Sequence, residues 1–181
     1  MAKTNDLAFL RLLCTSGIDI VTLMPVASEC IKRLVPSFSL SMIRVSEDYI
    51  PEHHYSEHFD AFSHDLFASS GHHFSTRSDD PAAFANLLTN KVPYGTLIDS
   101  PPGFEDGAIY QHLFARNGIH HVLDVALRDA GGPRGILGIF RERGTRPFTR
   151  SDVATMQEIY PHLVHACAAV PLPARFDEIE S

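Results

Sequence analysis

The spacing of apolar residues changes several times along this chain, and each change predicts a different element. Apolar positions three and four apart predict a helix whose buried face carries Leu23, Ala27, Cys30, Ile31 and Leu34. Thr22 is its expected N-cap, Pro25 is expected in the first turn, and Pro36 ends it. A shorter helix over residues 5–13 precedes it.

The next segment, residues 37–45, alternates apolar and polar residues as a half-buried strand does. Phe38, Leu40 and Met42 face one way, and the serines between them face the other.

Residues 51–70 return to spacings of three and four, which predicts a helix with a stripe of Tyr55, Phe59, Phe62 and Leu66. Loops and one short helix through Phe84, Leu87 and Leu88 follow, so the middle third is expected to be loop-rich.

The C-terminal part is the most regular. A helix through Ile109, Leu113 and Phe114 is expected to end at Gly118, and two strands over residues 119–128 and 135–141 form an antiparallel hairpin. Thr149-x-x-Asp152 is typical of a helix start, and an apolar stripe follows it at Val153, Met156, Tyr160, Leu163, Val164 and Cys167. This order predicts an α+β fold: an antiparallel sheet with terminal helices on one face and a loop-rich helical cover on the other. Residues 1–170 would form one domain, and 171–181 a polar tail.

Composition excludes several classes of protein. The 181 residues are 44% hydrophobic and 20% charged, which is typical of a soluble globule. No apolar run approaches the roughly 18 residues that cross a bilayer, and the N-terminus is a poor signal peptide, so we expect a cytoplasmic protein without membrane contact. The formal net charge is -7 and no helix gathers basic residues, so direct nucleic-acid binding by this chain is not expected. Cys14, Cys30 and Cys167 stand far apart, which predicts buried thiols rather than disulfides or a zinc site.

Residues 114–163 carry a series of motifs: Gly-Ile after a helix, a glycine-rich hairpin turn, G-x-L-G followed by an arginine, and a Pro-Phe-Thr-x-x-Asp cap. The run resembles the GAF-like, or autoinducer-domain-like, sensor segment of LuxR-type transcription regulators, and residues 23–36 are also similar. The matching positions are Gly118, Ile119, Gly135, Leu137, Gly138, Arg141, Pro147, Phe148, Asp152, Pro161, His162 and Leu163.

The resemblance implies a GAF/PAS-like sheet, small-molecule sensing, and a DNA-reading helix-turn-helix after this domain. The 181 residues contain no such reader, so the expectation is either a sensor separated from it or a stand-alone sensor that acts through a partner. Each matching residue has a folding role, so the motifs specify the fold better than the ligand.

The eleven histidines suggest a metal or haem site. His54 and His58 would share a helical face, with Glu57 and His53 nearby, but a zinc site needs three or four converging ligands. A solvated helix face is the preferred interpretation, and the same holds for the loop residues His72 and His73.

Two further sets of histidines lie on predicted elements, one on a strand and the other on a helix. His121 shares a strand face with Leu123, where it would either line a pocket or pair with a backbone carbonyl. His162 and His165 are expected on a helix surface or in a dimer contact. The chain has neither a G-x-S-x-G elbow nor a phosphate loop, so no enzyme activity is expected.

Together these patterns favour a non-enzymatic sensor that binds a small, largely apolar or aromatic ligand between the sheet and residues 49–104, with no cofactor or metal. The signal would leave through the terminal helices, and helices 22–35 and 151–169 would form a homodimer. The alternatives are a ligand-free interaction module and a haem or metal sensor that uses the histidines. The candidate pocket residues are Phe38, Leu40, Met42, Tyr49, Tyr55, His58, Phe59, Phe62, Tyr94, His121 and Leu123.

Overall fold

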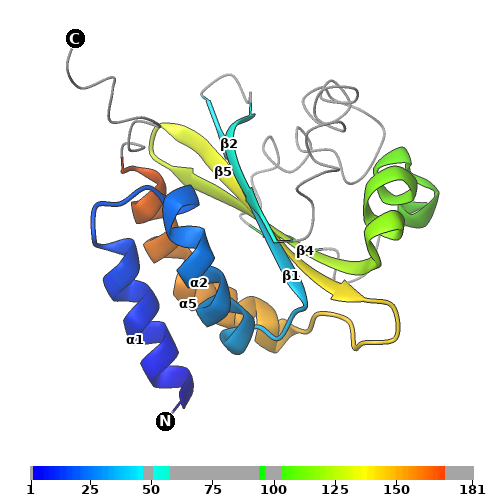
Figure 1. Ribbon diagram of the computed structural model, residues 1–181, viewed down its shortest axis with the longest axis horizontal. Coiled ribbons are helices and arrows are strands. Elements are labelled where there is room, and N and C mark those ends of the chain that lie inside the picture. The colour runs from blue at the N-terminus through cyan, green and yellow to red at the C-terminus, as the bar shows by residue number, and fades with distance from the viewer. Residues whose placement is uncertain (1, 47–50, 58–93, 97–102, 170–181) are drawn as a thin grey trace.

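The computed structural model describes residues 2–46, 51–57, 94–96 and 103–169. An antiparallel sheet of five strands, in the order β2-β1-β5-β4-β3, forms its centre (Figure 1). The strands are β1 (Ser39–Val45), β2 (Pro51–Ser56), β3 (Tyr94–Thr96), β4 (Ile119–Asp129) and β5 (Gly132–Glu142).

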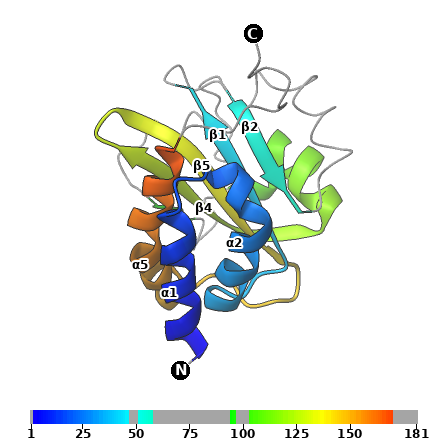
Figure 2. The ribbon, with the colours of Figure 1, turned by 60° about the vertical axis from the view of Figure 1, so that its left-hand side comes forward.

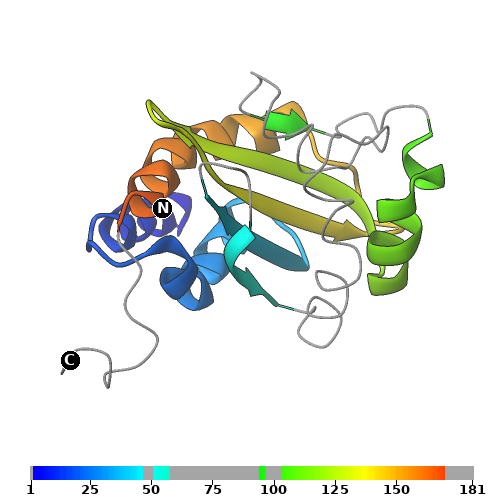
Figure 3. The same ribbon diagram turned by 90° about the horizontal axis from the view of Figure 1, so that it is seen from above.

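Three helices lie on one side of this sheet, and we call the face they cover the helix-side face (Figures 1 and 2). They are α1 (Ala2–Cys14), α2 (Ile20–Leu34) and α5 (Arg150–Cys167). The opposite face, here the distal face, carries at one end the short helical segments η1 (Phe104–Asp106), η2 (Tyr110–Phe114) and η3 (Ala115–Asn117) (Figure 3). This confirms the α+β fold with the terminal helices on one face. Among the described helices, none combines the length and apolar character that a bilayer crossing needs.

Helix α2 starts earlier than its sequence pattern suggested. The carboxylate of Asp19 accepts a hydrogen bond from the Val21 N–H, so Asp19 is the N-cap and the prediction of Thr22 was wrong. An aspartate is a strong cap because its charge faces the positive end of the helix. Pro25 therefore lies beyond the first turn, where its missing N–H removes one helical hydrogen bond.

The helix predicted from residue 51 onward is wrong for the part of it that the structure describes. Pro51–Ser56 is strand β2, which pairs with β1 so that Tyr55 lies opposite Met42 and His54 opposite Ile43. Pairing with the free edge of β1 satisfies backbone groups, and this overrode a weak helical spacing. His54 is therefore on a strand, and Phe59 and Phe62 lie outside the described residues.

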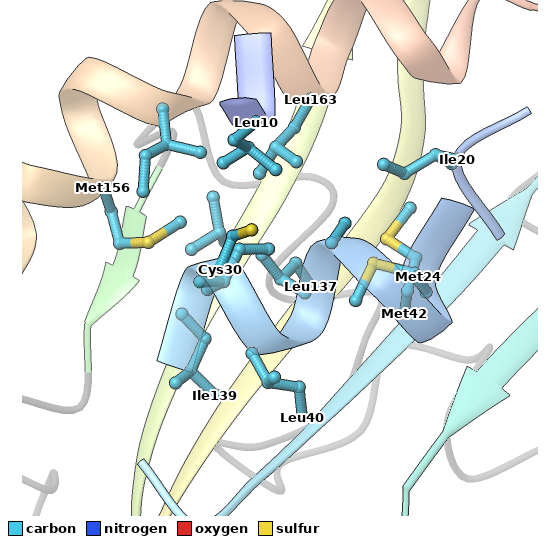
Figure 4. Packing of buried hydrophobic residues seen from close by; sticks show 14 of the residues in the cluster. Leu10, Ile20, Met24, Cys30, Leu40, Met42, Leu137, Ile139, Met156 and Leu163 are labelled. Carbon is cyan, nitrogen blue, oxygen red and sulfur yellow. The ribbon is translucent and has the colours of Figure 1, made fainter. Parts of the chain in front are cut away.

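The helix-side core joins the three helices to the sheet (Figure 4). Its fully buried members include Leu10, Met24, Ile31, Leu40, Met42, Leu123, Leu137 and Ile139. Helix α1 packs on both α2 and α5 and so covers part of their outer surface (Figure 2). The three cysteines are each 1% exposed in this core, as predicted, and burial raises the pKa of Cys14 to about 11.

The C-terminal expectations hold with one change. Strands β4 and β5 form the predicted antiparallel hairpin, with Val125 opposite Leu137. Thr149 and Asp152 form a capping box at the start of α5. Gly118 ends the preceding helical segment with a φ of 71°, a conformation that favours glycine. That segment is a π-helical turn followed by a 3₁₀ turn rather than the α-helix expected from its spacing.

Candidate functional site

A row of small and polar residues crosses the distal face of the sheet, one from each strand. The pairing runs from Ser56 on β2 to Ser41 on β1, Gly138 on β5, Asp124 on β4 and Gly95 on β3. Residues directly opposite each other in antiparallel strands share a face, so register alone brings these five positions together. We call them the Asp124 row.

Apolar residues flank the Asp124 row on both sides. Ile43, Ile136 and Ala126 occupy the next paired positions in one direction, and Phe140 and Val122 in the other. All five side chains are at most 6% exposed. A polar strip between two buried apolar walls is the kind of lining that small-molecule sites use, because the walls supply contact area and the polar groups fix orientation.

Asp124 is the charged member of the row, and it is isolated. Its side chain is 5% exposed, and no hydrogen bond or ion pair joins it to any other described residue. Burial raises the pKa of this carboxyl to about 7. A buried carboxylate without partners is costly, because no group replaces the water that would solvate its charge.

Gly138 leaves room that an aromatic ring fills. A Cβ at this position would lie 2.5 Å from Cζ of Phe140 and 3.0 Å from the Ser41 hydroxyl oxygen. The Phe140 ring therefore lies over the backbone of Gly138, the residue paired with Asp124, and a side chain at Gly138 would displace it.

Phe140 also belongs to a second apolar cluster, the distal cluster, which holds the η segments against β4 and β5. Its buried members are Phe104, Ile109, Tyr110, Phe114, Ile119, Val122 and Phe140, with Phe38 and Leu113 packed against them. The ring centroids of Phe114 and Phe140 are 5.9 Å apart. The Tyr110 hydroxyl lies 2.9 Å from Nδ1 of His120 and accepts a hydrogen bond from Arg143 at 3.3 Å. These contacts position aromatic groups beside the Asp124 row, on the side of Val122 and Phe140.

Several predicted pocket residues lie on the other face. Leu40, Met42 and Leu123 are fully buried in the helix-side core, under the terminal helices, and so do not share a face with Asp124. Strand alternation separates two faces but does not say which one the helices cover. The backbone of Tyr94, the first residue of β3, pairs with that of Val125 on β4.

Phe38 and Tyr55 have different neighbours from those predicted. Phe38 packs against the distal cluster and not with Leu40 and Met42, because it precedes the first residue of β1. Tyr55 packs against the helix-side core, with its hydroxyl 3.4 Å from the Ser28 hydroxyl. Three further candidates, Tyr49, His58 and Phe59, lie outside the described residues, as does Phe62.

Two of the histidines considered from the sequence, His121 and His162, have partners within the chain. Nε2 of His121 lies 3.2 Å from the Thr145 carbonyl oxygen, which confirms the interpretation of a histidine paired with the backbone. Burial and the neighbouring His120 lower the pKa of His121. Arg11 donates a hydrogen bond to Nε2 of His162 at 3.0 Å, so this residue links α5 to α1 within the chain.

Asp124 was not among the predicted site residues. It is the acidic residue in the middle of the apolar run Val-Leu-Asp-Val-Ala-Leu, on the strand face opposite Leu123. A charged residue in the middle of a buried strand could have been noticed in the sequence, because such residues are rarely fully buried unless they are paired. Whether Asp124 has a partner can be judged only once the register of the neighbouring strands is known.

Two other sites are weaker candidates. A groove of about 260 Å³ is lined by Phe38, Arg141, Arg146 and neighbouring residues. Arg141 is already bound to the Pro36 carbonyl at 2.6 Å and to both oxygens of Asp152. Within the described ranges, no three His, Cys, Asp or Glu side chains gather as a metal site would require.

The sequence matches no family model and no curated protein. Solved structures do match the architecture. The GAF domain/HD domain protein from Geobacter sulfurreducens aligns with a TM-score of 0.55 at 18% identity, over 82% of this chain and 90% of that one. The fold is that of GAF domains.

Two other GAF domains agree with this assignment. One, from a two-component sensor histidine kinase of Bacillus halodurans, gives a TM-score of 0.52 at 17% identity, over 82% of this chain and 90% of that one. GAF3 of a Synechocystis protein, in its photoproduct state, gives 0.53 at 16% identity, over 83% of this chain and 95% of that one. At these identities the likeness establishes the GAF-like fold, and it does not point to LuxR-type regulators.

Proposed function

We propose that this chain is a non-enzymatic sensor domain that binds a small molecule against the distal face of the sheet. The observation that carries the proposal is the Asp124 row, in which a buried carboxylate without a partner among the described residues lies between apolar walls. A fold that only needed stability would gain from an apolar residue at this position, because the isolated charge is destabilising. The GAF-like fold supports the proposal by analogy.

Strand β1 offers a route for the signal. Its residues Ser41 and Ile43 line the distal face, while Arg44 contacts the helices on the other side. Arg44 forms an ion pair with Asp19, the N-cap of α2, and donates a hydrogen bond of 3.0 Å to the carbonyl oxygen of Ala169, just beyond α5. A shift of β1 on ligand binding would therefore reach the start of α2 and the end of α5 together.

The finer part of the proposal is that the domain regulates a LuxR-type transcription factor in the cytoplasm. Its support is the run of motifs over residues 114–163, which fold as the resemblance implies: Gly118 ends a helix, and Asp152 caps the next one. These motifs are structural, so the regulatory partner is inferred from the resemblance alone.

We also propose that the domain forms a homodimer through its terminal helices. Phe9 and Leu12 on α1 are 44% and 68% exposed, and Val26 on α2 is 49% exposed. Helix α1 covers part of the surface of α2 and α5 that the sequence suggested, so its own outer face is the better candidate. Light scattering after size exclusion should show a dimer that Leu12→Glu dissociates, whereas Arg116→Glu on η3 should leave it intact. A wild-type monomer would contradict this part of the proposal.

Native mass spectrometry tests the sensor function directly. Protein purified from cells of its source should carry a small molecule, seen as added mass that disappears on denaturation. Ser41→Phe places a ring in the Asp124 row and should remove that mass, while Ser151→Phe, the same change at an exposed position on α5, should retain it. Unaltered wild-type mass under all native conditions, or retention of the ligand by Ser41→Phe, would argue against binding at this face.

A further inference from the structure

We propose that the small molecule bound at the distal face carries a protonated nitrogen, an ammonium or amidinium group, that pairs with the Asp124 carboxylate. This inference rests on the proposed function and specifies the chemical class of its ligand. The juxtaposition behind it is a buried carboxylate that has no partner among the described residues and lies opposite Gly138, over which the ring of Phe140 packs, with Ser41 further along the same row.

No cation of the adjoining strands is placed to neutralise Asp124. Arg44 on β1 pairs with Asp19, Arg134 on β5 pairs with Asp129, and Arg141 on β5 pairs with Asp152. With these arginines paired elsewhere, the described residues of β1 and β5 supply no counter-ion to Asp124.

The titratable groups elsewhere on these strands are also distant. His120 and Arg128 are each four residues from Asp124 along β4, about 13 Å at the rise of a strand. On β2, His54 is displaced by two register positions from the Asp124 row, and the described part of β3 contributes Tyr94, Gly95 and Thr96. A cation that neutralises Asp124 must therefore come from outside the described residues, and a ligand can supply it.

The surroundings of Asp124 favour a cation over other ligand groups. A carboxylate and an aromatic ring together attract an ammonium group, since the face of the ring is electronegative. An anionic ligand would be repelled by Asp124. The Ser41 hydroxyl lies two strand spacings away, about 10 Å from Asp124, and offers a hydrogen bond to the far end of a ligand. The Phe140 ring lies over Gly138, between those two ends, so the hydrocarbon body of the ligand would stack on this ring.

Isothermal titration calorimetry with phenethylammonium chloride tests the pairing, with 2-phenylethanol as the neutral probe of the same shape. The wild-type protein should bind the ammonium probe and not the alcohol. Asp124→Asn keeps the shape of the side chain and should weaken binding of the ammonium probe by about tenfold or more, because the ion pair is lost. Glu142→Gln removes an exposed carboxylate at the end of β5 and should change nothing.

The pH dependence supplies a second readout that a loss of folding would not imitate. Phenethylammonium keeps its charge at neutral pH, whereas Asp124 must lose a proton to pair with it. Affinity should therefore rise with pH, by about tenfold per unit while the carboxyl is protonated, and level off above a pH of about 7, the pKa of Asp124. The Asp124→Asn variant should show no such rise.

The outcomes separate the ligand class from the sensor function. Equal binding of the alcohol, or ammonium binding that Asp124→Asn does not weaken, overturns the cationic ligand and leaves the sensor proposal standing. A co-purified compound without a basic nitrogen does the same. If neither probe binds and no compound co-purifies, both proposals fail.

Discussion

The two faces of the sheet differ in how their buried charged groups are paired. On the helix-side face the core is apolar and its charged groups are matched: Arg141 lies against Asp152 and Arg44 against Asp19. On the distal face, Asp124 is as buried as Asp152 but has no partner among the described residues. Because a fold alone does not require an isolated charge, this difference underlies our proposal that the first face mainly stabilises the fold and the second binds a ligand.

Neighbouring residues on β5 show the same contrast at the smallest scale. Leu137 is fully buried in the helix-side core, and the next residue, Gly138, has no side chain and lies under the ring of Phe140. Filling one face and thinning the other is possible in a single strand because successive residues point in opposite directions. On one strand, a leucine therefore fills the helix-side core, while the next position leaves the distal face to an aromatic ring.

The largest effect is expected at the matched charge pair. Arg141 is 3% exposed, donates to Asp152 and to the Pro36 and Pro147 carbonyls, and lies 4.0 Å from the centre of the Phe148 ring. Arg141→Ala would leave Asp152 buried and unpaired, so we expect a loss of about 5 kcal/mol in the free energy of unfolding. Urea denaturation followed by circular dichroism measures it.

Arg146→Ala is the matched control for this substitution. Its guanidinium lies 3.5 Å from the same Asp152 carboxylate, but its side chain is 63% exposed. The exposed pair should contribute less than about 1 kcal/mol. Comparable losses of unfolding free energy in the two variants would show that burial of the arginine does not determine how much its pairing with Asp152 stabilises the protein.

The second effect belongs to the isolated carboxylate. Burial raises the pKa of Asp124 from its ordinary 3.8 to about 7, so the folded protein keeps a proton that the unfolded chain releases. The stabilisation is complete below pH 3.8, declines as pH rises towards 7, and is absent above it. Asp124→Asn should remove about 4 kcal/mol of this pH dependence, at about 1.4 kcal/mol per pH unit.

The pH dependence of stability must be compared between wild type and Asp124→Asn, because Asp152 changes stability with pH in the opposite direction. Burial raises the pKa of Asp152, but hydrogen bonds from Arg141 and Thr149 outweigh it and hold the pKa below its usual range. That carboxylate stabilises the protein at neutral pH and loses its effect as pH falls. Equal pH profiles for wild type and Asp124→Asn, measured by urea denaturation from pH 4 to 8, would show that Asp124 has a solvated or paired environment.

The sequence predicted the matched face better than the isolated one. The capping box, the hairpin and the helix stripes are local patterns, so Thr149, Asp152 and Gly118 could be assigned from spacing alone. The Asp124 row joins residues from five strands, and its composition depends on register between distant segments. Strand β2 was mistaken for a helix, which concealed the pairing of Ser56 with Ser41. Spacing could also not reveal which strand face the helices cover, so Leu123 was chosen and Asp124 was not.

A third comparison tests the two faces with adjacent residues. Leu137 is fully buried in the helix-side core, while Ile136 is 2% exposed and belongs to neither the helix-side nor the distal cluster. Leu137→Ala should cost about 3 kcal/mol of unfolding free energy, the usual result of a cavity in a packed core. Ile136→Ala should cost less, because Ile136 belongs to neither of the two described core clusters, and should weaken phenethylammonium binding more. Chemical denaturation and calorimetry on both variants decide this, and a larger stability loss at Ile136 would reverse the assignment of the faces.

The smallest effect is expected at the start of α5, where the helix-side layer begins. Thr149 accepts a hydrogen bond from the Asp152 N–H at 3.3 Å, and its own hydroxyl and N–H donate to the Asp152 carboxylate. Thr149→Ala removes the hydroxyl contacts but keeps the backbone bond, so unfolding should become easier by about 1 kcal/mol. Thr149→Ser retains the hydroxyl and should recover most of the loss in a thermal melt. Because the cap lies outside the Asp124 row, phenethylammonium affinity should stay unchanged in both variants; a change there would show that the helix-side layer also shapes the ligand face.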